Sequence, residues 1–215
     1  MLSKGDLEKK TRIQFNQWSR YYDNDLLWGW YFEHSIKRVL SLIVPKRDDM
    51  ILDLGCGTGN LGIALSGYVN KCYGIDISDK MINVAKRKQI NYKIAEDKLK
   101  YITGKADQID FPSSYFDFVF CLNSFHHYVS QDDVLREIYR ILKPDGILVL
   151  LDPFLNNLLR RLWIIFLNRF FHEPYVKYHT QESLQFMLNK NGFYVIEQQT
   201  FLYFTLLSII KKVVN

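Results

Sequence analysis

The sequence predicts an α/β fold, a doubly wound sandwich with helices on both faces of a seven-stranded, mostly parallel sheet. From residue 50 onward, short apolar runs alternate with amphipathic helical stretches. The runs are apolar at successive positions, so both faces of each strand are expected to be buried, as in parallel sheets. The 215 residues suit one such domain better than two.

The expected elements follow one another in a regular order. Strands are expected at 50–54, 71–76, 99–104, 116–122, 146–152 and 193–201. Helices are expected at 60–67, 79–90, 131–142 and 180–191. Ser78 is a typical cap for the helix that it precedes, and the KPDG stretch at 143–146 is expected to turn the chain into the fifth strand. The tail, 201–215, is expected to add a last edge strand.

Two segments are additional to this minimal sandwich. Residues 1–45 are rich in aromatic side chains and are expected to be helical, with Pro45 ending the helix. Residues 153–177 form an insertion after the fifth strand. The predicted organisation is one domain over 1–215. It comprises a helical N-terminal cap at 1–45, a ligand-binding core at 50–152, a lid at 153–177, and a C-terminal helix and strands at 178–215.

Composition excludes several classes of protein. The three cysteines, Cys56, Cys72 and Cys121, are odd in number and far apart, so neither a disulfide framework nor a zinc site is indicated. The first twelve residues are polar and lack the apolar core of a signal peptide, which favours the cytoplasm. The apolar stretches 154–171 and 201–210 are interrupted by arginines or too short to span a bilayer.

A glycine-rich turn follows the first strand. Gly55, Gly57 and Gly59 allow a sharp turn and close approach of the backbone to a ligand. Asp76 ends the next strand, where an acidic residue can accept hydrogen bonds from ribose hydroxyls. The spacing is G-x-G-x-G and not the dinucleotide pattern G-x-G-x-x-G, and the nearby Asp53 would repel a pyrophosphate. A nucleoside ligand that carries a cationic group is therefore favoured.

With these residues in view, the chain resembles the class I S-adenosylmethionine-dependent methyltransferases, which have a Rossmann-like fold. The stretch DLGCGTG at 53–59 is similar to their first motif, and YGIDIS at 73–78 is similar to the second. Further similarity covers ADQIDFP at 106–112, FDFVF at 116–120 and LKPDG at 142–146. The layout is similar to the methyltransferase type 11 group, in particular its ubiquinone/menaquinone-biosynthesis-like branch.

The resemblance implies S-adenosyl-L-methionine as the cofactor. It places Asp53 and the glycines around the methionine part, Asp76 on the ribose, and Ile77 and Asp107 at the adenine. The cofactor-binding residues that it implies are Asp53, Gly55, Cys56, Gly57, Asp76, Ile77, Ala106, Asp107, Gln108 and Asn123. No metal ligands are expected.

Few catalytic side chains are needed, because a sulfonium is already an activated leaving group and the protein mainly supplies positioning and exclusion of water. The candidates are His126, His127 and Tyr22. A histidine can deprotonate an acceptor whose pKa lies near neutrality, and an aromatic ring can flank a cationic group. Packing or orientation remains an alternative role for each histidine.

Within this resemblance, two acceptor classes are disfavoured. Enzymes that methylate amino groups of nucleic-acid bases carry an Asn/Asp-Pro-Pro-aromatic motif after the fourth strand, whereas this chain reads NSFH at 123–126. Metal-dependent catechol-type enzymes carry acidic residues around that strand end. No nucleic-acid partner is therefore expected.

The insertion has its own pattern. Apolar residues recur at helical spacing, while arginines interrupt the other faces. The recurring residues are Leu155, Leu158, Leu159, Leu162, Phe166 and Phe170. Such a helix at 154–171 can pack on the sheet as a lid, cover a hydrophobic acceptor, or lie peripherally on an anionic membrane.

The predicted function is methyl transfer to a small-molecule or lipid acceptor, such as a quinone precursor or a phospholipid headgroup. Two other functions remain open: a non-catalytic protein that binds S-adenosylmethionine, and a nicotinamide-dependent oxidoreductase. The glycine spacing and Asp53 disfavour the oxidoreductase. The sequence does not indicate an oligomeric state.

Overall fold

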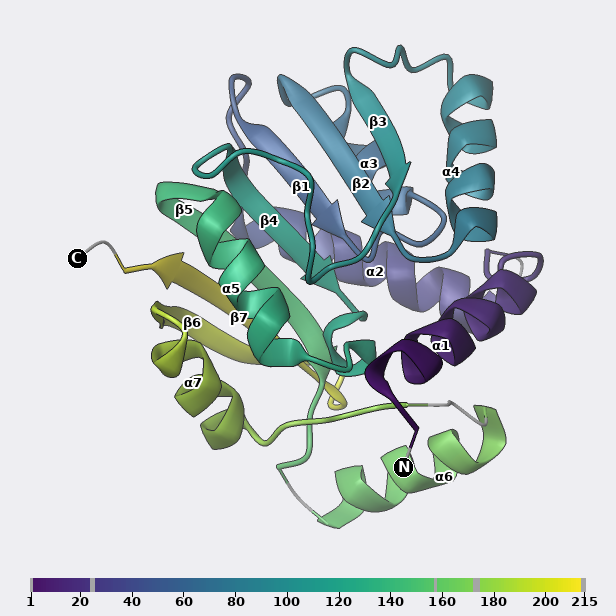
Figure 1. The fold of residues 1–215 in the computed structure, drawn as a ribbon, viewed down its shortest axis with the longest axis vertical. Helices are drawn as coiled ribbons and strands as arrows, with labels where there is room; N and C mark the ends of the chain where they lie inside the picture. The colour runs from purple at the N-terminus through teal and green to yellow at the C-terminus, as the bar shows by residue number, and fades with distance from the viewer. Residues whose placement is uncertain (1, 24–25, 157, 172–174, 214–215) are drawn as a thin grey trace.

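A computed structural model describes residues 2–23, 26–156, 158–171 and 175–213. Seven strands form one sheet in the order β3-β2-β1-β4-β5-β7-β6 (Figure 1). The strands are β1 (Met50–Leu54), β2 (Lys71–Asp76), β3 (Leu99–Thr103), β4 (Phe116–Leu122), β5 (Leu142–Pro153), β6 (Phe193–Phe201) and β7 (Thr205–Lys212). The helices in the described ranges are α1 (Lys4–Trp18), α2 (Leu26–Leu42), α3 (Asn60–Leu65), α4 (Asp79–Asn91), α5 (Gln131–Ile141), α6 (Leu158–Phe171) and α7 (Gln181–Lys190).

The strand order creates a crevice beside β1. From β1 the chain adds β2 and then β3 on one side, and it returns to add β4 and β5 on the other. All these pairings are parallel, so the carboxyl ends of β1, β2 and β4 lie at one edge. Ligands of open α/β sheets bind at such a reversal of strand order. The predicted α/β sandwich is confirmed.

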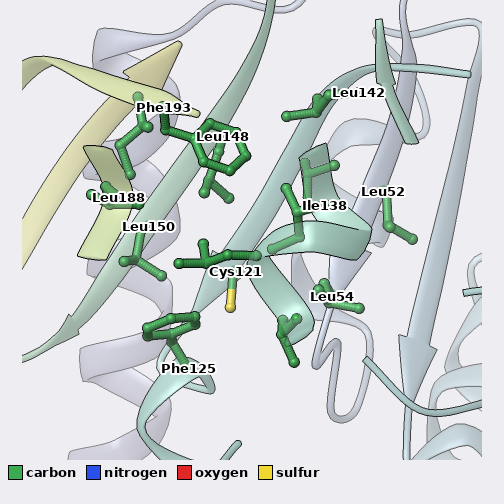
Figure 2. Packing of buried hydrophobic residues seen from close by; sticks show 14 of the residues in the cluster. Leu52, Leu54, Cys121, Phe125, Ile138, Leu142, Leu148, Leu150, Leu188 and Phe193 are labelled. Atoms are coloured by element: carbon green, nitrogen blue, oxygen red, sulfur yellow. The ribbon is translucent and has the colours of Figure 1, made fainter. Parts of the chain in front are cut away.

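Alternate residues of the central strands pack into two hydrophobic cores. Ile51 packs with the buried side chains of α2, α3 and α4, whereas its neighbour Leu52 packs with those of α5 and α7. Figure 2 shows Leu52, Leu54 and Ile138 in the second core. Burial of both faces is the reason that every residue of β1 except Asp53 is apolar.

The prediction that the tail forms an edge strand is wrong. β7 lies between β5 and β6 and is antiparallel to both, so β3 and β6 are the edges. Six successive side chains of β7, from Thr205 to Ile210, are buried, whereas β6 exposes polar residues such as Glu197. The more apolar strand takes the interior position because both of its faces can then leave water.

The KPDG stretch is part of β5 and does not precede it. Leu142 already pairs with Phe116, and the register shifts before Ile147 pairs with Phe118. Asp145 adopts a φ of 65° within this irregularity. The predicted turn therefore takes the form of a bulge, which keeps the strand continuous while it absorbs the extra residues.

The N-terminal segment consists of two helices with different positions. α2 packs on the sheet through Val39 and Ile43, whereas α1 lies below the arrowheads of β1 and β2 in Figure 1. Asn16 of α1 accepts a hydrogen bond from the Ser78 hydroxyl (2.6 Å) and donates to the Asp79 carboxylate (2.9 Å). These contacts hold α1 at the start of α4, beside the carboxyl ends of the strands.

The insertion contains α6, which Figure 1 shows below the sheet and apart from its strands. Within the described ranges, no helix has the length and apolar character needed to cross a membrane. Residues 157 and 172–174 lie outside the described ranges. The side chains of Leu158 and Phe170, which belong to the predicted apolar pattern, are likewise not described.

Candidate functional site

The turn after β1 brings backbone amides to the edge of the sheet. The amides of Gly55 and Cys56 both donate to the carbonyl of Ile75, at 2.8 and 3.0 Å. Gly55 has a φ of 76°, and a Cβ atom there would stand 2.5 Å from the side chain of Ser124. Only glycine satisfies both conditions, so the turn is possible because residue 55 lacks a side chain.

Asp76 holds the other side of this turn. One carboxylate oxygen accepts from the Gly57 amide (2.9 Å) and the other accepts from the Ser78 amide (2.8 Å). Each oxygen keeps a further lone pair for a ligand. The acidic residue at the end of β2 therefore both shapes the turn and presents acceptors to the crevice.

Two carboxylates lie close together at this edge, Asp53 buried and Asp76 half-buried. Asp53 is 3% exposed. Burial, together with the charge of Asp76, raises the pKa of Asp53 to about 8. Burial likewise raises the pKa of Asp76 to about 6, although the Ser78 and Gly57 amides oppose this shift. A cationic ligand would favour the ionised form of both groups, so this part of the site is suited to positive charge.

This pair predicts a pH dependence of stability. Above about pH 4 the folded protein holds protons that the unfolded chain has lost, on Asp76 up to about pH 6 and on Asp53 up to about pH 8. The free energy of unfolding should therefore fall as pH rises through this range. We expect the melting temperature of Asp53→Asn to fall less than that of the wild type between pH 5 and 8.5, by about 5 °C. If the melting temperatures of the two proteins fell by the same amount over this pH range, Asp53 would not have the raised pKa.

A pocket of about 820 Å³, including its open mouth, runs along the edge of the sheet past the glycine turn. Nine of the predicted site residues line it: Tyr22, Gly55, Gly57, Asp76, Ile77, Ala106, Asp107, Asn123 and His127. Four predicted residues do not: Asp53, Cys56, Gln108 and His126. Asp53 and Cys56 are buried beneath the turn, and Gln108 is exposed to solvent.

Helix α1 closes one side of the pocket. Thr11 and Phe15 line it, and the Lys4 ammonium pairs with the Asp107 carboxylate at 2.5 Å. A second ion pair joins Glu8 to Lys105 at 2.6 Å. Asp107, which the resemblance assigns to the adenine, is therefore already paired with a lysine. Sequence reasoning missed the α1 residues, because no motif marks them.

The chain after α1 is tied to the glycine turn. Asp23 accepts hydrogen bonds from the Thr58 hydroxyl (2.7 Å) and from the Lys88 ammonium (3.1 Å). Tyr22 directly precedes Asp23, and its ring lies against Gly57. A Cβ atom added to Gly57 would stand 3.7 Å from Tyr22 Cε1. These bonds place the Tyr22 ring over the backbone of the turn.

The two adjacent histidines have different surroundings. The Nδ1 atom of His126 is hydrogen-bonded to Oδ1 of Asp152 at 2.8 Å, and its ring stacks on Tyr178. Burial lowers the pKa of His126 to about 3, so this ring is neutral at pH 7. Sequence reasoning missed Asp152, although it ends a buried strand as Asp53 and Asp76 do. His126 does not reach the pocket.

His127 lines the pocket. Its ring meets the ring of Phe15 edge-on, with centroids 4.9 Å apart. Its Nδ1 atom is buried, and no hydrogen-bond partner for it exists among the described residues. Burial, together with the adjacent His126, lowers the pKa of His127 well below its usual value. The ring is thus neutral and leaves a buried polar atom unpaired, which is costly without a ligand.

At the same end of the pocket, Asn123 is held by the fold. It adopts a φ of 56°, its amide donates to the Leu151 carbonyl (2.6 Å), and its Oδ1 atom accepts from the Tyr31 hydroxyl (2.5 Å). Tyr31 is a further contact that sequence reasoning missed. Asn123 therefore has a fixed position between the glycine turn and His127.

The sheet order, the glycine turn and the paired acids define a class I methyltransferase fold. The residues also fit S-adenosylmethionine, the cofactor of this class. Asp53 and Asp76 suit its positive charge, and Gly57 leaves room for close contact. Asp76 and Asp107 present acceptors for hydroxyl and amino groups.

Comparisons with known proteins agree with this class. A family model described as a methyltransferase domain matches residues 52–150. The demethylmenaquinone methyltransferase of Lactobacillus johnsonii is 32% identical over 149 residues, which cover 65% of this chain and 59% of that protein. The ubiquinone/menaquinone biosynthesis C-methyltransferase UbiE of Vibrio vulnificus is 26% identical over 89% of this chain and 83% of that protein.

Solved structures show the same fold. The YcgJ protein of Bacillus subtilis superposes with a TM-score of 0.71 at 19% identity, over 85% of this chain and all of that chain. An S-adenosylmethionine-dependent methyltransferase of Aquifex aeolicus gives a TM-score of 0.67 at 18% identity, over 99% and 100% of the two chains. Together, the match over residues 52–150, the related sequences and the shared fold support assignment of this chain to the class I S-adenosylmethionine-dependent methyltransferases.

Coverage of the relatives is uneven. The alignments span 42%, 59% and 58% of three curated relatives, the YcgJ, Lactobacillus johnsonii and Azotobacter vinelandii proteins. These matches therefore support the family and do not assign an acceptor.

Proposed function

We propose that this chain transfers a methyl group from S-adenosylmethionine to a small, lipophilic acceptor. The observation that carries this proposal is the composition of the pocket beyond the glycine turn. There Phe15, Tyr22 and His127 form an aromatic lining, and the buried Nδ1 atom of His127 has no hydrogen-bond partner among the described residues. An acceptor with an apolar ring and one polar hydrogen would complement that lining.

The names of two relatives suggest which acceptor to test first. The Lactobacillus johnsonii protein is named for demethylmenaquinone and the Vibrio vulnificus protein for ubiquinone and menaquinone biosynthesis. We therefore take a quinone precursor as the first candidate and a phospholipid headgroup as the second. A reduced quinone is the chemically suitable form, since its hydroxyl groups make the ring carbons electron-rich.

Bound in this pocket, S-adenosylmethionine would supply a methyl group on an activated sulfonium. Asp76 would hold the ribose, while Gly55 and Gly57 would allow the backbone to contact the methionine part. Asn123 would stand beside that part, in the position that Tyr31 fixes. The rings of Tyr22 and Phe15 would exclude water and tolerate the positive charge.

We assign the proton-accepting role to His127. Its ring is neutral at pH 7 because burial lowers its pKa, and Nδ1 has no hydrogen-bond partner among the described residues. With the ring proton on Nε2, the lone pair of Nδ1 can accept a hydrogen bond. This atom would accept a hydrogen bond from the acceptor's hydroxyl or amino group and take the proton as the methyl group is transferred. His126 is a positioning residue, since Asp152 and Tyr178 hold it against His127, with the two ring centroids 3.9 Å apart.

The test measures transfer and binding separately. The protein is incubated with methyl-labelled S-adenosylmethionine and a short-chain demethylated naphthohydroquinone, or with phosphatidylethanolamine vesicles. We expect label in the organic phase. We also expect His127→Phe to lower kcat about 100-fold, while the Kd for S-adenosylhomocysteine changes less than about threefold, because His127 would act on the acceptor. Phe186→Ser on the exposed face of α7 serves as the control.

Three outcomes would change the proposal. In a second incubation, a lysate of the source organism replaces the defined acceptors. If the label then enters only the aqueous phase, a lipophilic acceptor is excluded. Binding of S-adenosylhomocysteine without turnover of any acceptor in that lysate would favour the non-catalytic alternative. Thermal stabilisation by NAD but not by S-adenosylhomocysteine would favour an oxidoreductase. The localisation that accompanies the proposal is cytoplasmic.

A further inference from the structure

The side of α6 that faces solvent is unusually apolar. Leu159, Leu162, Ile165 and Phe166 are between 54% and 67% exposed. Their spacing places them on one side of the helix, whereas Arg160, at about 100° from Leu159, is buried. Arg161 and Arg169 are exposed on the same side as the apolar residues. We call these six exposed residues the outer face of α6.

A second apolar element lies beside this helix. The turn between β6 and β7 exposes Leu202, Tyr203 and Phe204 by 37% to 46%. Arg160 of α6 donates to the Tyr203 carbonyl (2.6 Å), and its guanidinium lies over the Tyr203 ring, 4.7 Å from the centroid. The turn is thus attached to the inner side of α6, through the buried Arg160.

Two apolar residues of that turn have a left-handed backbone conformation. Leu202 and Tyr203 have φ values of 44° and 66°, in the left-handed region that favours glycine or asparagine. Large apolar residues are disfavoured in this conformation. The chain therefore has exposed apolar side chains at positions where glycine or asparagine would have a more favourable backbone energy.

The charge of the outer face of α6 favours an anionic membrane over a second copy of the chain as its binding partner. α6 contains no aspartate or glutamate over 158–171, and its outer face carries two arginines among four apolar residues. A second copy in a symmetric contact would bring arginines toward arginines. An anionic bilayer, in contrast, offers phosphates to the arginines and hydrocarbon to the apolar side chains.

We propose that the outer face of α6 is a docking surface for anionic membranes. The helix would lie in the plane of the interface, with its apolar side chains among the acyl chains and Arg161 and Arg169 at the headgroups. The inner side, through Arg160, keeps the helix attached to the domain. Bilayer binding does not depend on methyl transfer, so it can be tested separately.

The experiment is sedimentation of the whole 215-residue chain with vesicles. Phosphatidylcholine vesicles with about 30% phosphatidylglycerol are compared with pure phosphatidylcholine vesicles at low salt. Each cation near an anionic surface contributes about 1 kcal/mol, so Arg161→Gln/Arg169→Gln should weaken partition about 30-fold. Ile165→Ser/Phe166→Ser should also release the protein. Intact folding is checked by the thermal shift with S-adenosylhomocysteine.

Matched controls lie elsewhere on the molecule. Lys86→Gln/Arg87→Gln removes two exposed cations from α4, and Phe186→Ser removes one exposed ring from α7. Both controls should keep wild-type partition within about threefold. Equal binding to both kinds of vesicle, or unchanged binding of the α6 variants, would overturn the proposal. A dimer in solution that Phe166→Ser dissociates would overturn it in favour of a second copy.

Discussion

Asp76→Asn is expected to weaken binding of S-adenosylhomocysteine by about 100-fold or more. The carboxylate uses both oxygens, one for the Gly57 amide and one for the Ser78 amide. Asparagine has only one oxygen, so its NH₂ group would face one of these donors. The variant would also lose the charge-assisted hydrogen bonds to the ribose, each worth about 1.5–3 kcal/mol.

Calorimetric titration with S-adenosylhomocysteine measures this effect directly. Asp97→Asn is a suitable control, because Asp97 is exposed and does not line the pocket. The control should bind with wild-type affinity. If Asp76→Asn bound within about threefold of the wild type, Asp76 would not hold the ribose, and the assignment of the pocket would need revision.

Gly55→Ala should damage the fold itself. A Cβ atom would stand 2.5 Å from Ser124, and the backbone would keep a φ of 76° that alanine disfavours. Ser124 cannot withdraw easily, because its hydroxyl donates to the Leu54 carbonyl (3.0 Å). Steric overlap and the left-handed backbone together should lower the free energy of unfolding by about 3 kcal/mol or more.

Chemical denaturation measures the loss, and two further variants separate its causes. Gly67→Ala is the control, since a Cβ atom there would meet nothing within 4 Å. Gly55→Ala/Ser124→Gly removes the overlap with Ser124 but keeps the unfavourable backbone and a Cβ atom 2.9 Å from the Tyr128 hydroxyl, so it should regain only part of the lost stability. If Gly55→Ala proved as stable as Gly67→Ala, the turn would be able to rearrange, contrary to this structure.

Much of the site could be predicted because its residues are close in sequence to strand ends. Asp53 lies near the end of one apolar run, Asp76 ends the next, and the glycines follow directly. Local patterns of this kind survive folding, since parallel strands bring their carboxyl ends to a common edge. The predicted β6 and its neighbouring strand were also present, although their order in the sheet was wrong.

Other features depend on contacts between distant segments. The pairing of Lys4 with Asp107 joins residues that are about a hundred positions apart, and Tyr31 meets Asn123 over a similar separation. Neither pairing has a signature in the sequence, because the groups involved are also common on solvated surfaces. The same holds for the outer face of α6, whose apolar pattern is equally compatible with a packed lid.

The sequence by itself determined the fold class and the location of the cofactor site. Hydrophobic periodicity and the steric demands of the glycine turn act over a few residues and leave few alternatives. Only the tertiary structure distinguished His127, which lines the pocket and has a buried nitrogen without a partner among the described residues, from His126, which is held by Asp152. The two are identical neighbours in sequence, and the packing around each ring decides which one can meet a substrate.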